Sequence, residues 1–130
     1  MKFLCLICSE PPVEPISEAE MQRRFAAYAE FNAGLRKSGH YVGCNRLEPV
    51  DTAVTVRVRN GKVMTTDGPF AETKEQLGGY FLIEARDRDE AVRIASGIPA
   101  CRNGCVEVRP VAEDPLTMQA LGLVGESVAS

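Results

Sequence analysis

Two short segments of the chain are apolar at almost every position, and they constrain the fold more than any other feature. Residues 2–8 are Lys-Phe-Leu-Cys-Leu-Ile-Cys, and residues 80–83 are Tyr-Phe-Leu-Ile. Runs of this length, bounded by Ser-Glu-Pro-Pro in the first case and preceded by Gly-Gly in the second, predict strands that are covered on both faces. The sheet that contains them therefore needs a covering layer on each side.

Two helices are predicted from their capping signals. Residues 17–20, Ser-Glu-Ala-Glu, form a capping box that satisfies backbone N–H groups at a helix start. Apolar residues then recur at helical spacing as far as Leu35, and Gly39 supplies the left-handed residue that ends such a helix. Asp87, with Glu three residues later, predicts a second helix that runs to about Ser96, where a Gly and a Pro follow.

The remaining strands are predicted from alternation and turn residues. Val54, Val56 and Val58 alternate with polar residues, and Asn60-Gly61 is a strong signal for a two-residue hairpin turn. The last strand is expected to turn Val106 and Val108 inward and Glu107 and Arg109 outward. The predicted strand ranges are 41–47, 53–59, 62–66, 80–83 and 104–111.

This order predicts an α+β fold of the ferredoxin-like type. The pattern is βαββαβ with an extra β-hairpin, in which an antiparallel sheet carries two helices on one face. Because two helices cover only one face, the apolar residues on the other face need a second cover, and a second copy of the chain is the simplest one. We therefore expect a homodimer. Residues 113–130 form a tail that is either a short docking helix or a frayed end.

Composition narrows the function and the cellular setting. The chain has 130 residues and a net charge of −3, which suits one domain and disfavours nucleic acid as a partner. The apolar start is too short for a secretory leader or a membrane span. Five cysteines, an odd number, together with no secretory segment predict a cytoplasmic protein with free thiols.

Metal and cofactor sites are not expected. Cys5 and Cys8 are three residues apart on a strand, so they point to opposite faces and do not chelate jointly. His40 is the only histidine, which rules out a multi-histidine metal site or a catalytic triad. No glycine-rich phosphate loop or nucleophile elbow is present.

Four segments together resemble the DGPF family, a branch of the YCII-related proteins. They are "MKFLCLI", "VRVRNGK", "TDGPFAETKEQLGGY" and "VEVRPV", and the resemblance covers about residues 1–112. It implies a dimeric α/β-barrel built from ferredoxin-like protomers. It also implies that a reaction is unassigned for most members, and that many are encoded beside extracytoplasmic-function sigma factors.

Better-understood YCII-like relatives use a His on the first helix and an Asp near the end of the second as an acid/base dyad. When Gly39 is set against the glycine that ends the first helix in those relatives, Tyr28 falls at the His position and Ile98 near the Asp position. The chain therefore departs from the dyad at both positions. The mechanism of the relatives is therefore not expected to transfer.

The loop between the hairpin and residue 80 holds most of the candidate functional residues. Asp67 is either a turn acceptor, which we favour, or a carboxylate presented to a cleft. Phe70 is expected to anchor the loop. Glu72 and Lys74 are either a solvated charge run or a proton-transfer group with an anion-binding partner. The Gly78–Gly79 pair predicts close approach by a neighbouring strand or by a ligand.

Two hypotheses follow. The first is a dimer that binds a small polar or aromatic ligand in a cleft between sheet and helices, and that rearranges or cleaves it by proton transfer in the manner of a lyase or isomerase. The second is a non-catalytic regulatory module associated with a sigma factor. For the first, Tyr28 is a core residue or a hydrogen-bond donor, and His40 a surface, capping or ligand-binding residue. The candidate catalytic residues are Tyr28, Asp67 and Glu72, and the candidate ligand-binding residues are Lys74, Phe70 and His40.

Overall fold

The predicted order of strands and helices is confirmed in the computed structural model, which describes residues 1–123. The six strands are β1 (Lys2–Ser9), β2 (Tyr41–Arg46), β3 (Val54–Arg59), β4 (Lys62–Asp67), β5 (Gln76–Glu84) and β6 (Cys105–Pro110). The helices are α1 (Glu18–Lys37), α2 (Arg88–Ala95) and α3 (Pro115–Ala120), with short 3-10 turns at Val50–Thr52 and Pro99–Arg102.

Four of the strands form one antiparallel sheet in the order β2-β5-β1-β6. This is the strand order of the ferredoxin-like fold, so the predicted fold class is confirmed. Strands β3 and β4 pair only with each other and form the predicted extra hairpin. Asn60 and Gly61 have φ angles of 52° and 74°, as a tight hairpin turn of this kind requires.

The helix starts follow the predicted caps in part. The backbone N–H of Glu20 donates to Ser17 Oγ over 3.1 Å, but the Glu20 carboxylate pairs with Arg23 and Arg24 instead of returning to the cap. In α2 the backbone N–H of Glu90 donates to the Asp87 carboxylate over 2.9 Å. Each cap satisfies a donor that would otherwise lack a partner at the helix start.

The core lies between the sheet and helices α1 and α2. Phe3 and Ile83 are fully buried, and Phe81 packs against α1 through Tyr28 and Phe31, with ring centroids 6.4 and 5.1 Å apart. The core is completed by Cys5, Leu35, Ala85, Ala91, Ala95, Ile98 and Ala100. Val106 and Val108 pack against this cluster, which confirms their predicted inward orientation.

Strand β5 begins earlier than predicted, at Gln76 instead of residue 80. The pairing passes through Gly78 and Gly79 by means of a bulge opposite Ile7 and Cys8. A Cβ atom on Gly79 would lie 2.8 Å from the carbonyl oxygen of Asn45, so close approach of β2 requires glycine there. A Cβ on Gly78 would meet no atom within 4 Å. Of the two predicted causes of close approach at the Gly-Gly pair, a neighbouring strand is thus correct for Gly79.

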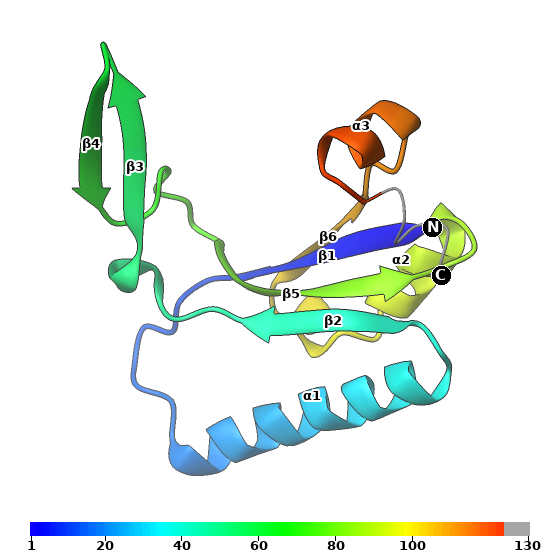
Figure 1. The fold of residues 1–130 in the computed structure, drawn as a ribbon. Coiled ribbons are helices and arrows are strands. Elements are labelled where there is room, and N and C mark those ends of the chain that lie inside the picture. Colours follow the sequence, from blue (N-terminus) through cyan, green and yellow to red (C-terminus); the bar gives the residue numbers. More distant parts are fainter. Residues whose placement is uncertain (124–130) are drawn as a thin grey trace.

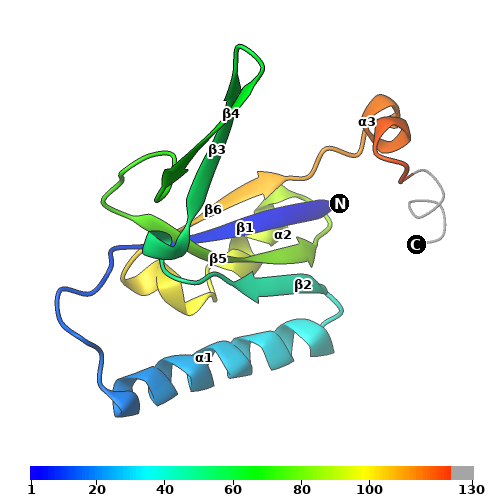
Figure 2. The ribbon, with the colours of Figure 1, turned by 60° about the vertical axis from the view of Figure 1, so that its left-hand side comes forward.

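The hairpin and α3 both stand on the side of the sheet away from α1 (Figures 1 and 2). The hairpin rises at one end of the sheet and α3 lies at the other (Figure 2). Helix α3 shows that the tail contains a short helix, capped by Asp114, and Met118 is its buried residue. Residues 124–130, the rest of the predicted tail, lie outside the described residues.

Candidate functional site

We call the side of the four-stranded sheet away from α1 the outer face, and two rows of paired residues cross it. Leucines occupy three of the four central positions of these rows, and Arg109, Glu107 and Asn45 occupy three of the four edge positions. The three leucines are half-buried within a single copy, because no other part of residues 1–123 covers them fully. One row is Gly43, Leu82, Leu4 and Arg109, and the other is Asn45, Tyr80, Leu6 and Glu107.

A polar pair lies at the β2 edge of the outer face. The side-chain amide of Asn45 donates to the hydroxyl oxygen of Tyr80 over 2.8 Å. Because the Tyr80 oxygen accepts in this bond, its proton is available for donation, and the Asn45 carbonyl oxygen is available as an acceptor. The pair thus places one donor and one acceptor side by side next to the leucines of the outer face. Sequence reasoning missed this pair, because cross-strand register decides which side chains meet.

The hairpin that flanks the outer face is itself apolar and exposed. Val54, Val56, Val58, Val63 and Met64 expose between 54% and 71% of their surface. A two-stranded hairpin of this kind is only marginally stable in water when nothing packs against it. The hairpin and the outer face together therefore form two neighbouring apolar surfaces with no cover among the described residues.

The loop after the hairpin is held by its backbone and by one threonine. The backbone N–H of Gly68, at φ 99°, donates to the Ala53 carbonyl over 2.7 Å, and Thr55 Oγ1 donates to the Gly68 carbonyl over 2.8 Å. Within residues 1–123 the Asp67 carboxylate accepts no hydrogen bond from this turn, so its predicted role as turn acceptor is wrong. Backbone groups carry that role.

Three predicted loop residues point into solvent. Phe70 is 82% exposed, so its predicted anchoring of the loop is wrong for a single copy. Glu72 is exposed, and Lys74 forms an exposed ion pair with Glu10 at 3.1 Å. Lys74 is thus already close to a carboxylate of this chain, and a ligand anion would compete with it. Exposed pairs of this type contribute little to stability.

Tyr28 and His40, the two predicted residues outside the loop, lie on α1 and just after its end. Tyr28 is on the helix-covered side of the sheet, where it stacks on Phe81. Burial raises the pKa of the Tyr28 phenol, so the group stays protonated at neutral pH. His40 follows the end of α1, and its Nδ1 lies 2.8 Å from the Glu84 carbonyl oxygen, which ties the ring to the β5 backbone.

No hydrogen bond or ion pair within residues 1–123 joins any two of the six candidate residues. Phe70, Glu72 and Lys74 share the loop that follows Asp67, the last residue of β4, whereas Tyr28 lies on α1 and His40 follows the end of that helix. A single copy therefore does not bring the predicted catalytic set together. Any site that uses the loop residues must draw further groups from elsewhere.

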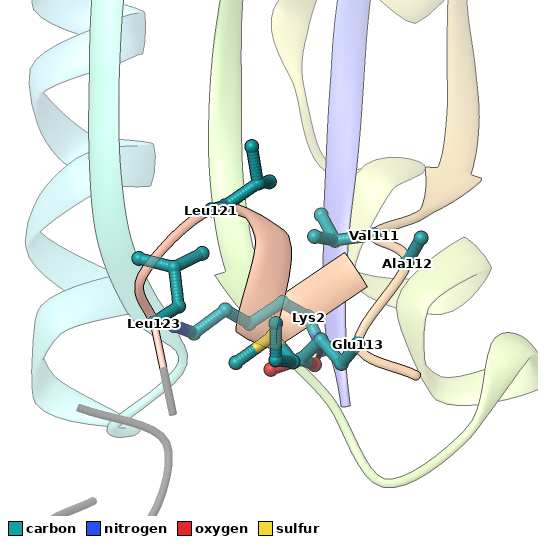
Figure 3. Close-up of a pocket in the computed structure, with 7 residues that line it drawn as sticks. Lys2, Val111, Ala112, Glu113, Leu121 and Leu123 are labelled. Carbon is teal, nitrogen blue, oxygen red and sulfur yellow. Dashed lines mark hydrogen bonds between the residues drawn. The ribbon is translucent and has the colours of Figure 1, made fainter. Parts of the chain in front are cut away.

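A small pocket lies between α3 and the ends of β1 and β6 (Figure 3). Its volume is about 130 Å³, well below the ~300 Å³ at which ligand pockets usually begin. None of the candidate residues lines it. The lining residues are Lys2, Val111, Ala112, Glu113, Met118, Leu121 and Leu123.

No three His, Cys, Asp or Glu side chains in residues 1–123 gather closely enough to hold a metal ion. In the same range, no helix combines the length and the apolar composition that crossing a bilayer requires.

Comparison with known protein families shows which family the chain belongs to. Residues 1–114 match the YCII-related domain. The chain belongs to the YCII-related family. The match covers most of the chain and confirms the resemblance at this level, while membership of the DGPF branch stays a prediction.

A YCII-related relative is an uncharacterized protein of Rhizobium meliloti (strain 1021). The two sequences are 45% identical over 69 residues, which are 52% of this chain and 56% of the relative. The chain thus spans just over half the length of this curated relative. The relative's description assigns no activity that could be transferred.

The structure also bears on the dyad of the better-understood YCII-like proteins. Ile98, near the position of their Asp, is 1% exposed and belongs to the core. Tyr28, at the position of their His, packs on Phe81. The two positions hold packing residues in this YCII-related chain, in agreement with the expectation that the dyad mechanism does not transfer.

Proposed function

We propose that this YCII-related protein is a homodimeric binding protein, in which the outer faces of two copies pack together and enclose a cleft for a small polar or aromatic ligand. The observation that carries the proposal is the apolar outer face, flanked by an apolar hairpin. Soluble proteins seldom leave contiguous apolar surfaces of this kind uncovered. A second copy offers the same leucine rows in reverse, as a twofold interface requires.

The area of the outer face supports a role for the hairpin in the dimer. Four strands about 4.8 Å apart, each contributing about six residues at about 3.3 Å, give a face of about 400 Å² in projection. A stable interface buries about 800 Å² on each partner. The sheet alone supplies about half of this, so we infer that the hairpin of each copy also packs against the other.

The ligand is proposed to bind near the Asn45–Tyr80 pair. This pair offers one donor and one acceptor beside the leucine rows, which fits a flat ligand with a carbonyl and a neighbouring N–H or O–H group. Binding has more support than proton transfer, because Tyr28 lies across the sheet from the loop that carries Asp67 and Glu72. We therefore propose binding as the function, with lyase or isomerase chemistry as an extension that this geometry does not favour.

Dimer formation is tested by the variant Leu6→Glu, measured by sedimentation equilibrium. The native protein is expected at twice the chain mass of 14.1 kDa, and the variant at the mass of one chain. A charge at the centre of an apolar interface would have to be buried without a partner. The matched control is Val13→Glu, which adds the same charge at a fully exposed residue and should leave the mass doubled. A native protein that sediments as one copy at micromolar concentration would refute the proposal.

Ligand binding is tested by NMR titration with small aromatic amides such as benzamide. Shifts are expected to cluster at Asn45 and Tyr80 in the native protein and to weaken in Tyr80→Phe, which keeps the ring and removes the donor. His40→Gln, at the far end of α1, is the control. Shifts spread evenly over the surface, or equal shifts in Tyr80→Phe, would rule out this site.

The alternative, a regulatory module that acts with a sigma factor, rests on the family resemblance, whereas the proposed cytoplasmic location rests on the five cysteines and the sequence of the first residues. The two functions differ in what they require of the outer face. A regulatory module would use the outer face to bind a different protein. The alternative would therefore be favoured if the native protein had the mass of one chain and a sigma factor co-purified with it from the native cells.

A further inference from the structure

A pair of cysteines lies at one end of the outer face. Cys8 of β1 and Cys105 of β6 are direct register partners on adjacent antiparallel strands. Both follow the alternation of the outer face, since Cys8 continues the series of Leu4 and Leu6. This pair could not be predicted from the sequence, because 96 intervening residues separate positions 8 and 105.

The spacing of the two strands suits a disulfide. Directly opposed residues of antiparallel strands have Cα atoms about 4.5 to 5.5 Å apart, and disulfides join Cα atoms about 4.4 to 6.8 Å apart. The bond therefore needs no movement of the backbone. Both thiols are free, and Cys105 is exposed while Cys8 is half-buried.

The other three cysteines are placed differently. Cys5 is buried on the opposite side of the sheet, and Cys44 faces the core. Cys101 is exposed, and its thiol donates to the Ala95 carbonyl oxygen over 3.3 Å. Cys8 and Cys105 are thus the two cysteines of the chain that are paired across neighbouring strands.

A carboxylate lies beside the pair. The Cys105 thiol donates to Glu75 Oε1 over 3.6 Å. Desolvation and the nearby Glu75 charge raise the pKa of the Cys105 thiol, and desolvation with Glu107 and Glu75 raises that of Cys8. Because the thiolate is the reactive form, these charges slow oxidation at neutral pH. The pair is therefore suited to remain reduced unless an oxidant persists.

We propose that Cys8 and Cys105 are a reversible dithiol site, oxidised by hydrogen peroxide to a disulfide at a rate that Glu75 restrains. The Cys105 thiolate attacks one peroxide oxygen, the O–O bond breaks, and a sulfenic acid and one water form. The Cys8 thiolate then attacks the sulfenic sulfur, the S–S bond forms, and a second water leaves. Two thiols lose two electrons in total, and one peroxide becomes two waters.

Oxidation also changes the end of the candidate loop. The disulfide removes the thiol proton that Glu75 accepts. Glu75 is bonded through its carbonyl oxygen to Thr73 Oγ1 over 2.6 Å and directly precedes β5. Oxidation of the pair therefore removes one contact of the residue that ends the loop containing Glu72 and Lys74. This inference concerns one chain and does not rest on the proposed dimer.

The test is a thiol count and a peptide map of the full-length protein after treatment with hydrogen peroxide. The native protein is expected to lose two of its five thiols, with recovery by dithiothreitol, and the map should join the peptides of residues 8 and 105. Cys101→Ser, which removes another exposed thiol, should still lose two. Cys105→Ser should form no disulfide. Crosslinks between chains, a different pairing, or a disulfide in Cys105→Ser would overturn the proposal.

The role of the carboxylate has a separate kinetic readout. Glu75→Gln removes the charge and keeps the shape, so the thiolate fraction rises and disulfide formation should be about twofold faster or more at pH 7. Glu72→Gln, three residues earlier in the loop, is the matched control and should leave the rate unchanged. Equal rates in native protein and Glu75→Gln would overturn the restraint assigned to Glu75.

Discussion

The four-stranded sheet and the β3–β4 hairpin are both built from paired antiparallel strands, yet only the sheet has a core. In the sheet, Phe3, Cys5 and Ile83 are fully buried beneath α1 and α2. In the hairpin, Thr55 is the one strand residue that is not exposed. Figure 1 shows the reason, since the hairpin extends from the body of the fold with no helix over either face.

The comparison separates two sources of strand stability. Strands of the sheet are stabilised by burial against helices of the same chain. The hairpin has good turn residues and regular pairing, but its valines gain little from folding while they remain in water. An alternating pattern thus predicts a strand and one apolar face, and it does not say which molecule will cover that face.

The largest expected effect is the loss of stability when a core residue of the four-stranded sheet is shortened. Phe3→Ala should lower the free energy of unfolding by about 3 to 5 kcal/mol, because it leaves a cavity in a closely packed core. Val58→Ala in the hairpin should change the stability of a single copy by less than about 0.5 kcal/mol. Urea denaturation of dilute protein checks both values. Similar losses in the two variants would mean that the hairpin is as well packed as the sheet.

The next effect distinguishes two adjacent glycines in β5. Gly79→Ala should cost about 1 to 3 kcal/mol, because its Cβ would lie 2.8 Å from the Asn45 carbonyl oxygen and β2 would have to shift. Gly78→Ala has no atom within 4 Å of its Cβ and is the matched control, with a much smaller change. Thermal unfolding of both variants gives the answer, and equal melting temperatures would contradict the close approach of β2.

A smaller effect is expected in the hairpin, and only in the assembled state. Under the proposed dimer, Val56 of each copy is partly buried against the other, and Val56→Ala removes about 0.7 kcal/mol of apolar burial from each copy, or about 1.4 kcal/mol per dimer. The dimer dissociation constant should therefore rise about tenfold, while unfolding of the dilute protein stays unchanged. Sedimentation at several concentrations measures this constant. Leu116→Ala on the exposed side of α3 serves as control, and equal dissociation constants for native protein and Val56→Ala would remove the hairpin from the interface.

Most of the fold could be predicted because its signals are local. The caps at Ser17 and Asp87, the Asn60-Gly61 turn and the apolar run at residues 80–83 each depend on a few neighbouring residues. The start of β5 was missed because a Gly-Gly pair normally weakens a strand, whereas here β2 approaches so closely that only glycine fits at residue 79.

The candidate site could be predicted only as a surface. The leucines of the outer face follow from alternation along β1 and β5. The Asn45–Tyr80 and Cys8–Cys105 pairs depend on which residues face each other across strands, and that register is set by the whole sheet. Phe70, Glu72 and Lys74 were predicted from their chemical type alone. Their exposure in a single copy depends on the direction of the hairpin before them, which local sequence does not reveal.

The smallest expected effect is the loss of stability in acid, which we assign in part to the cap of α2. The backbone N–H of Glu90 holds the pKa of Asp87 below its ordinary value, and the backbone N–H of Arg86 does the same for Glu90. A carboxylate whose pKa is lowered in the folded state stabilises the fold above the unfolded pKa of about 4, and this contribution is lost as pH falls through the folded pKa. Stability should therefore decline below about pH 4 as the cap of α2 becomes protonated.

Asp87→Asn keeps a capping side chain without the charge, so the difference between its urea midpoints at pH 7 and pH 3 should be smaller than in the native protein. If the two differences are equal, the cap of α2 has no part in the acid response, and the loss of stability must come from carboxylates elsewhere.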